Sequence, residues 1–292
     1  MNKKNIFDVL SSKDGISREE TSNILLKKEE IRRHHFKSND LKRLIIRLDF
    51  VGVTRIENLV FALKANFRDD FRFKRLPKGN GSTKGLDSLL GIDNGTLSNL
   101  PIYSFYSDNY KQPSSRLSIN ISEFSISLEL DCMNYDGFDN YRDLTIEIFQ
   151  KLIALEPFAE IKKIGIHKTS AFWAEDQKLI RGAIELEALP NPVVEEHFPQ
   201  CSYSDEFYWI ERNVAVKLLR QLWWGTMISG ENQKPVLQVA LKYDVTRDVS
   251  TTQIKQIDKE FLFETLNQIN DAHFELFKRS MTEQYLNRHC HD

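Results

Sequence analysis

The stretch KGNGSTKG at residues 78–85 holds three glycines, a Ser-Thr pair and two lysines, which are the residue types of a phosphate-binding loop. A Walker A loop requires a second glycine five positions after the first, followed by Lys and by Ser or Thr. Here Lys84 stands five positions after Gly79, and no glycine falls at the third position of the Rossmann pattern. We therefore interpret the stretch as a turn that follows a strand.

The seven histidines are the next residues with metal-binding or acid–base chemistry. His289, Cys290 and His291 form the richest group, but they lie at the end of the sequence, where order is least expected. His167 ends a predicted core strand, so an enzyme with a site near His167 or Asp136 is one alternative function. Asp136 lies in a turn before a predicted helix, where carboxylates accept free backbone N–H groups. We expect no metal ion, no cofactor and no catalytic residue.

A locally basic segment runs from residue 64 to residue 84, with seven Lys or Arg and two Asp, and phenylalanines alternate with its basic residues. Basic side chains contact phosphates and aromatic rings stack on nucleobases in proteins that bind single-stranded nucleic acid. The same alternation is typical of an amphipathic strand whose phenylalanines face the core. Nucleic-acid binding is therefore an alternative function, and its candidate residues are Arg68, Arg72, Lys74, Arg75, Lys78 and Lys84.

The segment SYSDEFYW at residues 202–209 is rich in aromatic residues, and Tyr and Trp are favoured anchors in protein interfaces. It lies in a region, 174–212, with no clear periodicity, whose stretch NPVVEEHFPQCSYSDEF contains two prolines, and we interpret this region as an elaborated loop. A buried loop is the other interpretation of the aromatic residues. The predicted partner-binding residues are Tyr203, Phe207, Tyr208 and Trp209.

The elements that position these residues are predicted from periodicity. Residues 41–53 alternate, which places Leu44, Ile46, Leu48 and Phe50 on one face of a strand. Apolar residues three and four apart predict a helix after Thr54 as its cap. Further strands are predicted at 71–76, 117–121, 124–132 and 161–173, weaker ones near 180–187, 214–226 and 235–246, and further helices at about 137–156 and 258–287.

Length and composition place limits on the class of protein. A chain of 292 residues with 41% hydrophobic and 28% charged residues is typical of one large or two small globular domains. The formal charge of −2 gives no overall attraction to nucleic acids or acidic membranes. Three widely spaced cysteines favour a reducing compartment, and no apolar run reaches the roughly 18 residues of a membrane span. We therefore expect a cytoplasmic protein without membrane contact.

The order of these elements predicts an α+β fold with a large, mainly antiparallel twisted sheet and helices packed on one face. The sheet is built from repeated strand-strand-helix units. We expect a charged helical N-terminal arm at residues 1–40, an α+β half at 41–173, and a second α+β half at 174–292 that includes the irregular segment 174–212 and a long C-terminal helix.

Three segments together resemble a sporadically distributed bacterial family of uncharacterised proteins, over about residues 40–286. They are NDLKRLIIRLDF, the run from ISEFSISLEL through NYDGFDNYRDLTIEIFQKLI to IKKIGIHKTSAFW, and KPVLQVALKYDV with the helix that follows. Lys163, and the residues His167-Lys168-Thr169, depart from the family's central strand. The resemblance implies no catalytic residues. The patchy distribution of the family is typical of mobile accessory genes, including genes for phage defence and immunity.

These observations favour a non-enzymatic protein that binds another macromolecule. We expect the chain to bind a partner protein and to serve as an immunity, antitoxin or phage-defence component. The alternatives are a nucleic-acid-binding protein that uses residues 64–84 and an enzyme with a site near His167. Assembly of the chain into a homo-oligomer is compatible with the sequence.

Overall fold

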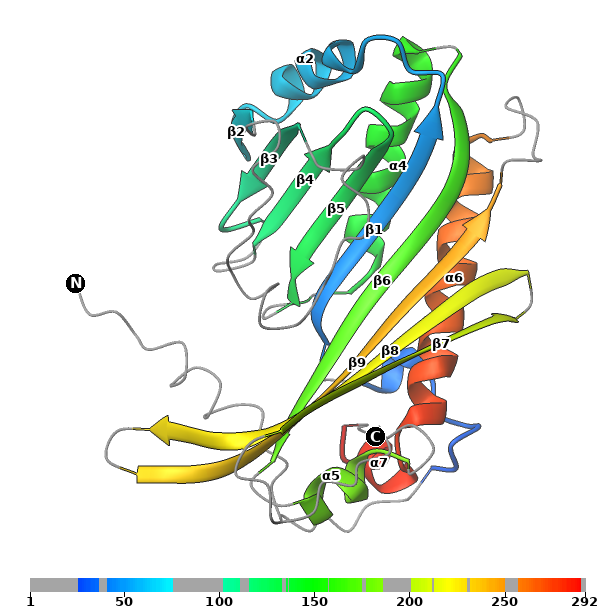
Figure 1. The fold of residues 1–292 in the computed structure, drawn as a ribbon. Helices are drawn as coiled ribbons and strands as arrows, with labels where there is room; N and C mark the ends of the chain where they lie inside the picture. Colours follow the sequence, from blue (N-terminus) through cyan, green and yellow to red (C-terminus); the bar gives the residue numbers. More distant parts are fainter. Residues whose placement is uncertain are drawn as a thin grey trace. The chain divides into compact units, whose positions relative to one another are not determined.

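The computed structural model describes residues 26–36, 41–75, 102–110, 116–132, 135, 137–156, 158–174, 177–185, 201–211, 213–229, 232–249 and 257–289. Its strands form one sheet in the order β2-β3-β4-β5-β1-β6-β9-β8-β7, as Figure 1 shows. The pairs β1–β5, β2–β3, β3–β4, β4–β5 and β7–β8 are antiparallel. The predicted α+β fold with a large, mainly antiparallel sheet is therefore confirmed, whereas the repeated strand-strand-helix units stay a prediction.

The strands are β1 (Leu41–Val51), β2 (Arg72–Arg75), β3 (Tyr103–Ser107), β4 (Leu117–Ile121), β5 (Ser125–Asp131), β6 (Glu160–Ala174), β7 (Cys201–Glu211), β8 (Val214–Ser229) and β9 (Asn232–Asp248). The helices are the short 3₁₀ helix η1 (Arg33–His35) and the α-helices α2 (Ile56–Asn66), α4 (Asp139–Leu155), α5 (Gln177–Ala183), α6 (Lys259–Ser280) and α7 (Glu283–His289).

The chain forms two compact units, each described by itself. Unit 1 comprises Met1–Lys42, Lys168–Val245 and Asn270–Asp292, and unit 2 comprises Arg43–His167 and Thr246–Ile269. Each unit is discontinuous in sequence, since β1, β6, β9 and α6 contribute residues to both. The boundaries drawn from the sequence at residues 40 and 173 stay a prediction.

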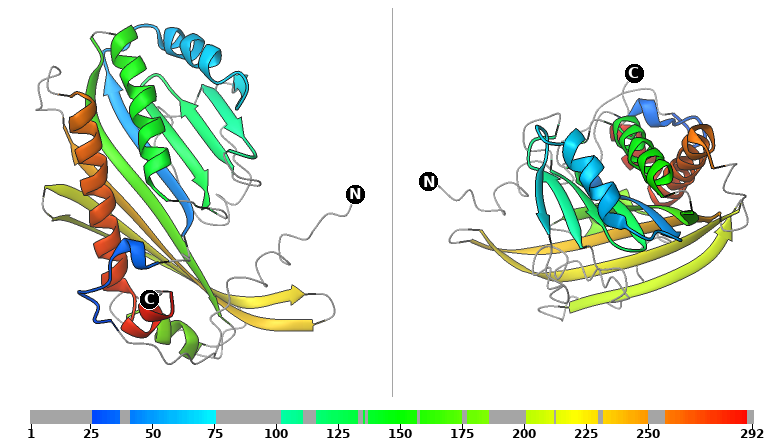
Figure 2. Two further views of the ribbon diagram at one scale, coloured as in Figure 1. Left: turned by 180° about the vertical axis from the view of Figure 1, so that it is seen from behind. Right: turned by 90° about the horizontal axis from the view of Figure 1, so that it is seen from above.

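The core of unit 2 lies between its strands and α4. The alternation predicted for β1 is confirmed, because Leu44, Ile46, Leu48 and Phe50 are all buried. In the register of β1 with β5, the first three lie directly opposite the buried residues Leu130, Leu128 and Ile126 of β5. Helix α4 crosses that face of the sheet (Figure 2). Burial of such a face on both strands is the main source of stability of a half-buried sheet.

The opposite face of the unit 2 strands is polar. Arg43 on β1 forms an ion pair with Glu129 on β5. Glu129 also accepts a hydrogen bond of 3.4 Å from Asn120 on β4, which in turn accepts one of 2.9 Å from Ser104 on β3. This chain of contacts explains why charged residues alternate with apolar ones in LKRLIIRLDF: one set faces the core and the other bonds across strands.

The start of α2 corrects one prediction. Thr54 does not cap the helix with its own side chain, and the N-cap residue Arg55 makes no side-chain cap either. Instead the buried carboxylate of Glu156, which follows α4, accepts hydrogen bonds from the Thr54 backbone N–H and hydroxyl, each at 3.1 Å, and from Asn58 at 3.3 Å. A distant carboxylate therefore supplies the negative charge that a helix N-terminus favours.

Unit 1 packs the end of α6 and helix α7 against β6 and β9. The hydroxyls of Tyr243 on β9 and Ser280 on α6 are hydrogen-bonded, and Phe172 on β6 meets Tyr285 on α7 edge to face with ring centroids 5.7 Å apart. Burial raises the pKa of Tyr243 to about 12. His273 on α6 is also buried, so it belongs to the core of this unit.

Two further predictions for unit 1 are wrong. The single helix predicted over 258–287 is two helices, α6 and α7. The helix is interrupted at Met281, which forms an isolated β-bridge with Ile184. The strand predicted near 180–187 is instead helix α5 followed by that one bridge residue. Each correction has the same cause, since the bridge is a tertiary contact between residues about a hundred positions apart in the sequence.

The predicted helical arm lies mostly outside the described residues. Its described part, residues 26–36, forms turns and η1. Among the helices that the structure describes, none combines the length and the apolar character that crossing a membrane requires.

Candidate functional site

Strands β7 and β8 form a long antiparallel hairpin in unit 1. Their register runs without interruption from the pair Cys201–Trp224 to the pair Glu211–Val214. Only positions 212 and 213 separate the strands, and Asn213 adopts φ 66°, a left-handed conformation that Asn tolerates better than most residues. β7 is the last strand in the sheet order, so within the described part of the chain it pairs with β8 alone.

This hairpin corrects the prediction of an irregular loop over 174–212, because residues 201–211 are a regular strand. The four predicted partner-binding residues all lie on β7, but they do not share one face. Tyr203, Phe207 and Trp209 alternate onto one side and Tyr208 onto the other. Tyr203 is 39%, Phe207 44% and Tyr208 68% exposed, while Trp209 is half-buried.

The side of β7 that carries Tyr203 and Phe207 is organised by Arg220 of β8. Arg220 is buried and makes a two-pronged ion pair with Asp205, donating from Nε to Oδ1 at 2.8 Å and from Nη2 to Oδ2. The Arg220 guanidinium also lies 4.4 Å from the centroid of the Phe207 ring. The Tyr203 hydroxyl donates to Asp205 at 3.2 Å, and burial followed by the nearby Asp205 charge raises the pKa of Tyr203. On this side of β7 the Asp205 carboxylate, the Tyr203 hydroxyl and the Arg220 guanidinium are therefore already bonded to one another.

The end of the same side is fixed by Arg279 of α6. Arg279 donates to both carboxylate oxygens of Glu211, at 3.0 and 2.7 Å, and these hydrogen bonds raise the pKa of Arg279. Trp209 Nε1 donates to the same carboxylate at 3.5 Å. The half-buried Trp209 is therefore held by the fold and contributes less free surface than the sequence suggested.

The other side of β7 carries the β7 outer row, which we define as Ser204, Glu206, Tyr208 and Ile210. All four side chains are exposed, with Ile210 reaching 80%. In the register with β8, Tyr208 lies directly opposite Lys217. Large apolar side chains at this exposure are unusual in the middle of a regular strand, where one face is ordinarily buried.

Tyr208 is held in place by two neighbours. Lys217 Nζ lies 5.3 Å from the centroid of the Tyr208 ring and 2.8 Å from Glu206 Oε2. Hydrogen bonds from Lys217 and then from Tyr208 lower the pKa of Glu206. Partial burial lowers the pKa of Lys217, but its hydrogen bonds with Glu206 and Tyr208 outweigh that effect, so the net shift is upward. The result is an exposed aromatic ring whose orientation is set before any partner arrives.

Sequence reasoning found Tyr208 but missed Glu206, Ile210 and Lys217. The signal was present in SYSDEFYWIE, since its residues alternate between two sets, and in the Asn at position 213, which is typical of a tight hairpin turn. It was hidden because both faces of β7 contain aromatic and acidic residues, which removes the polar–apolar contrast.

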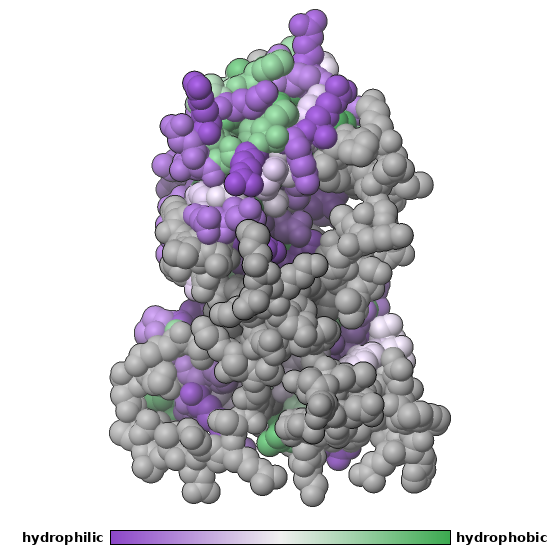
Figure 3. Space-filling view, turned by 90° about the vertical axis from the view of Figure 1, so that its left-hand side faces the viewer, coloured by the Kyte–Doolittle hydropathy of each residue, from purple (hydrophilic) through white to green (hydrophobic). Residues whose placement is uncertain are grey.

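A second surface lies along β2 and the adjoining end of α2 in unit 2. Of the six residues predicted to bind nucleic acid, Lys78 and Lys84 lie outside the described residues, and Arg68, Arg72, Lys74 and Arg75 are exposed. Figure 3 shows the described part of this side, where long hydrophilic side chains surround a smaller hydrophobic area. The structure therefore places three of the predicted basic residues on β2 and a fourth, Arg68, in the turn before β2.

Basic residues on this surface lie over aromatic rings. Lys64 Nζ is 4.4 Å from the centroid of Phe73, and Lys74 Nζ is 5.3 Å from that of Tyr106. Phe73 is half-buried and is stacked on Tyr103, so the prediction that the phenylalanines point inward holds only in part. In contacts of this kind the quadrupole of the ring attracts the cation.

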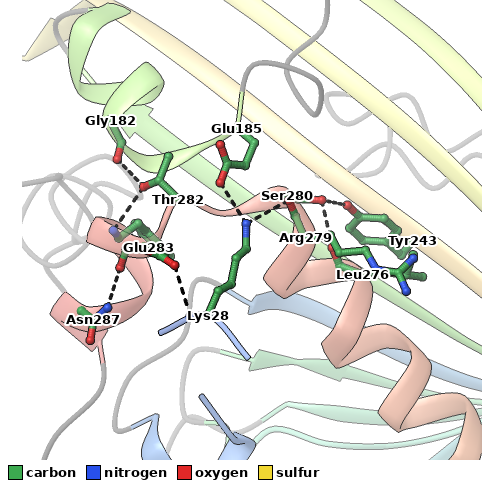
Figure 4. A network of polar contacts seen from close by, with 11 residues as sticks. Lys28, Gly182, Glu185, Tyr243, Leu276, Arg279, Ser280, Thr282, Glu283 and Asn287 are labelled. Atoms are coloured by element: carbon green, nitrogen blue, oxygen red, sulfur yellow. Dashed lines mark hydrogen bonds and ion pairs between the residues drawn. The ribbon is translucent and has the colours of Figure 1, made fainter. Parts of the chain in front are cut away.

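A polar network around Lys28 is drawn in Figure 4. Lys28 Nζ forms an ion pair of 2.9 Å with Glu185 and donates at 3.3 Å to the carbonyl of Arg279. Asn287 exchanges hydrogen bonds with the backbone of Leu26, at 2.8 and 2.9 Å. These contacts attach residues 26–28 to the ends of α5, α6 and α7, so we assign the network a structural role.

The histidine hypotheses gain little from the geometry. The prediction that His167 ends a strand is wrong, because His167 is half-buried in the middle of β6. His289 ends α7, while Asp136, Cys290 and His291 lie outside the described residues. Within the ranges that the structure describes, no three His, Cys, Asp or Glu residues are grouped so as to hold a metal ion. The enzyme near His167 or Asp136 stays a prediction.

Comparison with known proteins adds no functional information. No family model matches the sequence, and no curated protein matches it. Among solved structures, this chain is similar to the crystal structure of the di-domain ARO/CYC StfQ from the steffimycin biosynthetic pathway, at 12% identity over 80% of this chain and 96% of that chain, with a TM-score of 0.15. A TM-score of 0.15 does not support a shared fold or function. The resemblance to an uncharacterised bacterial family stays a prediction.

Proposed function

We propose that this chain is a binding protein whose β7 outer row contacts a partner protein. The observation that carries the proposal is Tyr208, a 68% exposed aromatic side chain that Glu206 and Lys217 hold in one orientation. Exposed aromatic residues that lose little conformational freedom on binding are typical hot spots. Ile210, two residues away on the same face, extends the apolar contact.

Electrostatics of the same face also suit binding. Glu206 and Lys217 neutralise each other, so a partner can cover them without burying an unpaired charge. A face of this kind offers an apolar centre at Tyr208 and Ile210 beside a satisfied polar rim, which is the usual anatomy of a protein interface.

The test is site-specific photocrosslinking in the native host, with p-benzoylphenylalanine in place of Tyr208. The matched control carries it in place of Phe61 on α2, because that side chain is exposed to nearly the same extent, 66%. We expect one dominant adduct from position 208 that position 61 does not give, and at least a ten-fold loss of the captured protein in the Tyr208→Ala variant. Equal labelling at both positions, or none at position 208, would overturn the proposal.

Nucleic-acid binding through β2 is the second candidate, favoured by the exposed Arg72, Lys74 and Arg75 beside aromatic rings. Fluorescence anisotropy with a labelled single-stranded oligonucleotide at rising salt tests it. Affinity that falls steeply with salt, and weakens further in the double variant Arg72→Ala and Lys74→Ala, would support this function. Absence of binding at low salt would remove it. An immunity, antitoxin or phage-defence role, and a cytoplasmic location, stay predictions.

A further inference from the structure

The segment 26–36, which we call the strap, lies along one set of residues in unit 1. Within the described part of the chain, every hydrogen bond, ion pair and ring contact that the strap makes outside itself goes to Glu185 or to residues 271–287. We call these residues the strap-binding face. Each of those contacts uses at least one side chain, so side-chain recognition, and not a backbone ladder, holds the strap.

Two apolar anchors lie five residues apart on the strap. Ile31 is 0% exposed. Phe36 meets Phe274 and Phe277 of α6 edge to face, with ring centroids 5.7 and 6.2 Å apart. Lys278 also donates from Nζ to the Ile31 carbonyl at 3.4 Å. Burial of the two anchors supplies the apolar part of the binding free energy.

The strap and its binding face also carry opposite charges. The strap has four Lys or Arg and two Glu. Its Arg33 forms an ion pair with Asp271, and Lys28 Nζ forms one of 2.9 Å with Glu185. The Lys28 backbone N–H donates to Glu283 at 3.3 Å (Figure 4). A basic segment with two apolar anchors is therefore the kind of ligand that this face fits.

The polar contacts hold the strap less firmly than the core is held. The side chains of Arg33 and Asp271 are 44% and 60% exposed, and those of Lys28 and Glu185 are 22% and 36% exposed. Ion pairs at such exposure contribute little, since water screens them and long side chains lose freedom. A segment with few buried contacts opens by local unfolding far more often than the whole protein unfolds. The strap can therefore leave its own face while the rest of unit 1 stays folded.

The cost of filling the vacant face differs between an unrelated polypeptide and a second copy of the chain. An unrelated polypeptide would leave the displaced strap in water, with Ile31 exposed. A second copy brings a strap with the same spacing of basic and apolar residues, and it offers a face to the displaced strap. Reciprocal exchange therefore buries both straps and closes as a two-fold dimer with no binding site left over.

We propose that the strap of one copy binds the strap-binding face of a second copy, so that the chain forms a two-fold dimer by exchange of residues 26–36. The inference goes beyond the proposed function, since it uses no residue of the β7 outer row. The exchanged strap makes the same contacts as in the single chain, so concentration decides between the two forms. Only residues 37–40 link the strap to β1, and a segment on a short link competes at an effective concentration of roughly 1 mM, so wild-type dimers should become abundant towards that concentration.

The test is native mass spectrometry of two full-length variants with reversed charges. The strap-reversed variant carries Lys28→Glu and Arg33→Asp, and the face-reversed variant carries Glu185→Lys and Asp271→Arg. Like charges meet at both pairs in either variant alone, whereas in an equal mixture each strap meets opposite charges on the face of the other variant. We expect mixed dimers to outnumber the dimers of either single variant by about ten-fold or more.

Two controls separate exchange from general charge attraction. A chain with all four substitutions restores both ion pairs within itself, so it should form dimers like the wild type and no mixed dimers with it. In sedimentation equilibrium, an excess of a synthetic peptide of residues 26–36 should dissociate wild-type dimers, whereas the same peptide with Ile31→Asp should not. A wild type that stays monomeric at roughly 1 mM, dimers with no preference for the mixed pair, or dimers that the peptide leaves intact would each overturn the exchange.

Discussion

The contact between Glu156 and the start of α2 makes a sharp stability prediction. Glu156 is 5% exposed and accepts three hydrogen bonds, two from Thr54 to Oε2 and one from Asn58 to Oε1. Thr54 and Asn58 are themselves exposed, so water replaces part of what the carboxylate supplies when it is removed. We therefore expect Glu156→Ala to lower the free energy of unfolding by about 2 kcal/mol, close to the loss of a strong helix cap.

The atoms involved also rank a second substitution. Glutamine has one acceptor oxygen, and with that oxygen in the place of Oε2 it keeps both bonds from Thr54 and loses only the bond from Asn58. Glu156→Gln should therefore cost about half as much, roughly 1 kcal/mol. The matched control is Glu147→Ala on α4, the helix that Glu156 follows, which removes an exposed ion pair with Lys151 and should cost about 0.5 kcal/mol or less.

Urea unfolding followed by two signals measures these changes. All four tryptophans lie between residues 173 and 224, inside unit 1, so their fluorescence reports that unit, whereas circular dichroism at 222 nm reports helices of both units. We expect the loss in Glu156→Ala to show in the dichroism transition. Equal effects of Glu156→Ala and Glu147→Ala, or a loss confined to tryptophan fluorescence, would refute the assignment of Glu156 as the residue that anchors the start of α2.

Three further predictions concern single residues. Because the pKa of Tyr243 is raised to about 12 from 10.0, its contribution is complete below pH 10 and is lost as pH rises through 12, so unfolding free energy should fall by about 2 kcal/mol more in the wild type than in Tyr243→Phe between pH 9.5 and 12. Urea titrations at both pH values measure this, and parallel curves would contradict it. Gly52→Ala should cost about 3 kcal/mol in thermal unfolding, because Gly52 has φ +77° and an added Cβ would lie 2.2 Å from the Phe158 carbonyl oxygen; an unchanged melting temperature would count against that strain. Lys28→Met breaks the partly buried pair with Glu185, so amide exchange in residues 26–36 should rise about five-fold, for a loss of about 1 kcal/mol, whereas unaltered exchange would argue that the network does not hold the segment.

Much of unit 2 was predictable because its signals are local. The alternation of Leu44, Ile46 and Leu48 fixes the buried face of β1, since successive side chains of a strand point to opposite sides. The spacing of three and four in Tyr141, Leu144 and Ile148 likewise fixes the buried stripe of α4. Such patterns need only neighbours within a few residues, so they are readable without knowing what the element packs against.

The features that matter for binding needed the tertiary structure. The sequence alone determined that residues 202–209 are rich in aromatic residues, but their place in a strand at the end of the sheet, and not in a loop, depends on pairing with β8. That register places Lys217 opposite Tyr208 and beside Glu206, and the position of β7 at the end of the sheet leaves one of its backbone edges without a paired strand among the described residues. Periodicity along a chain reports which face a residue takes, whereas only the arrangement of strands decides which residues become neighbours and which strand stands at the edge.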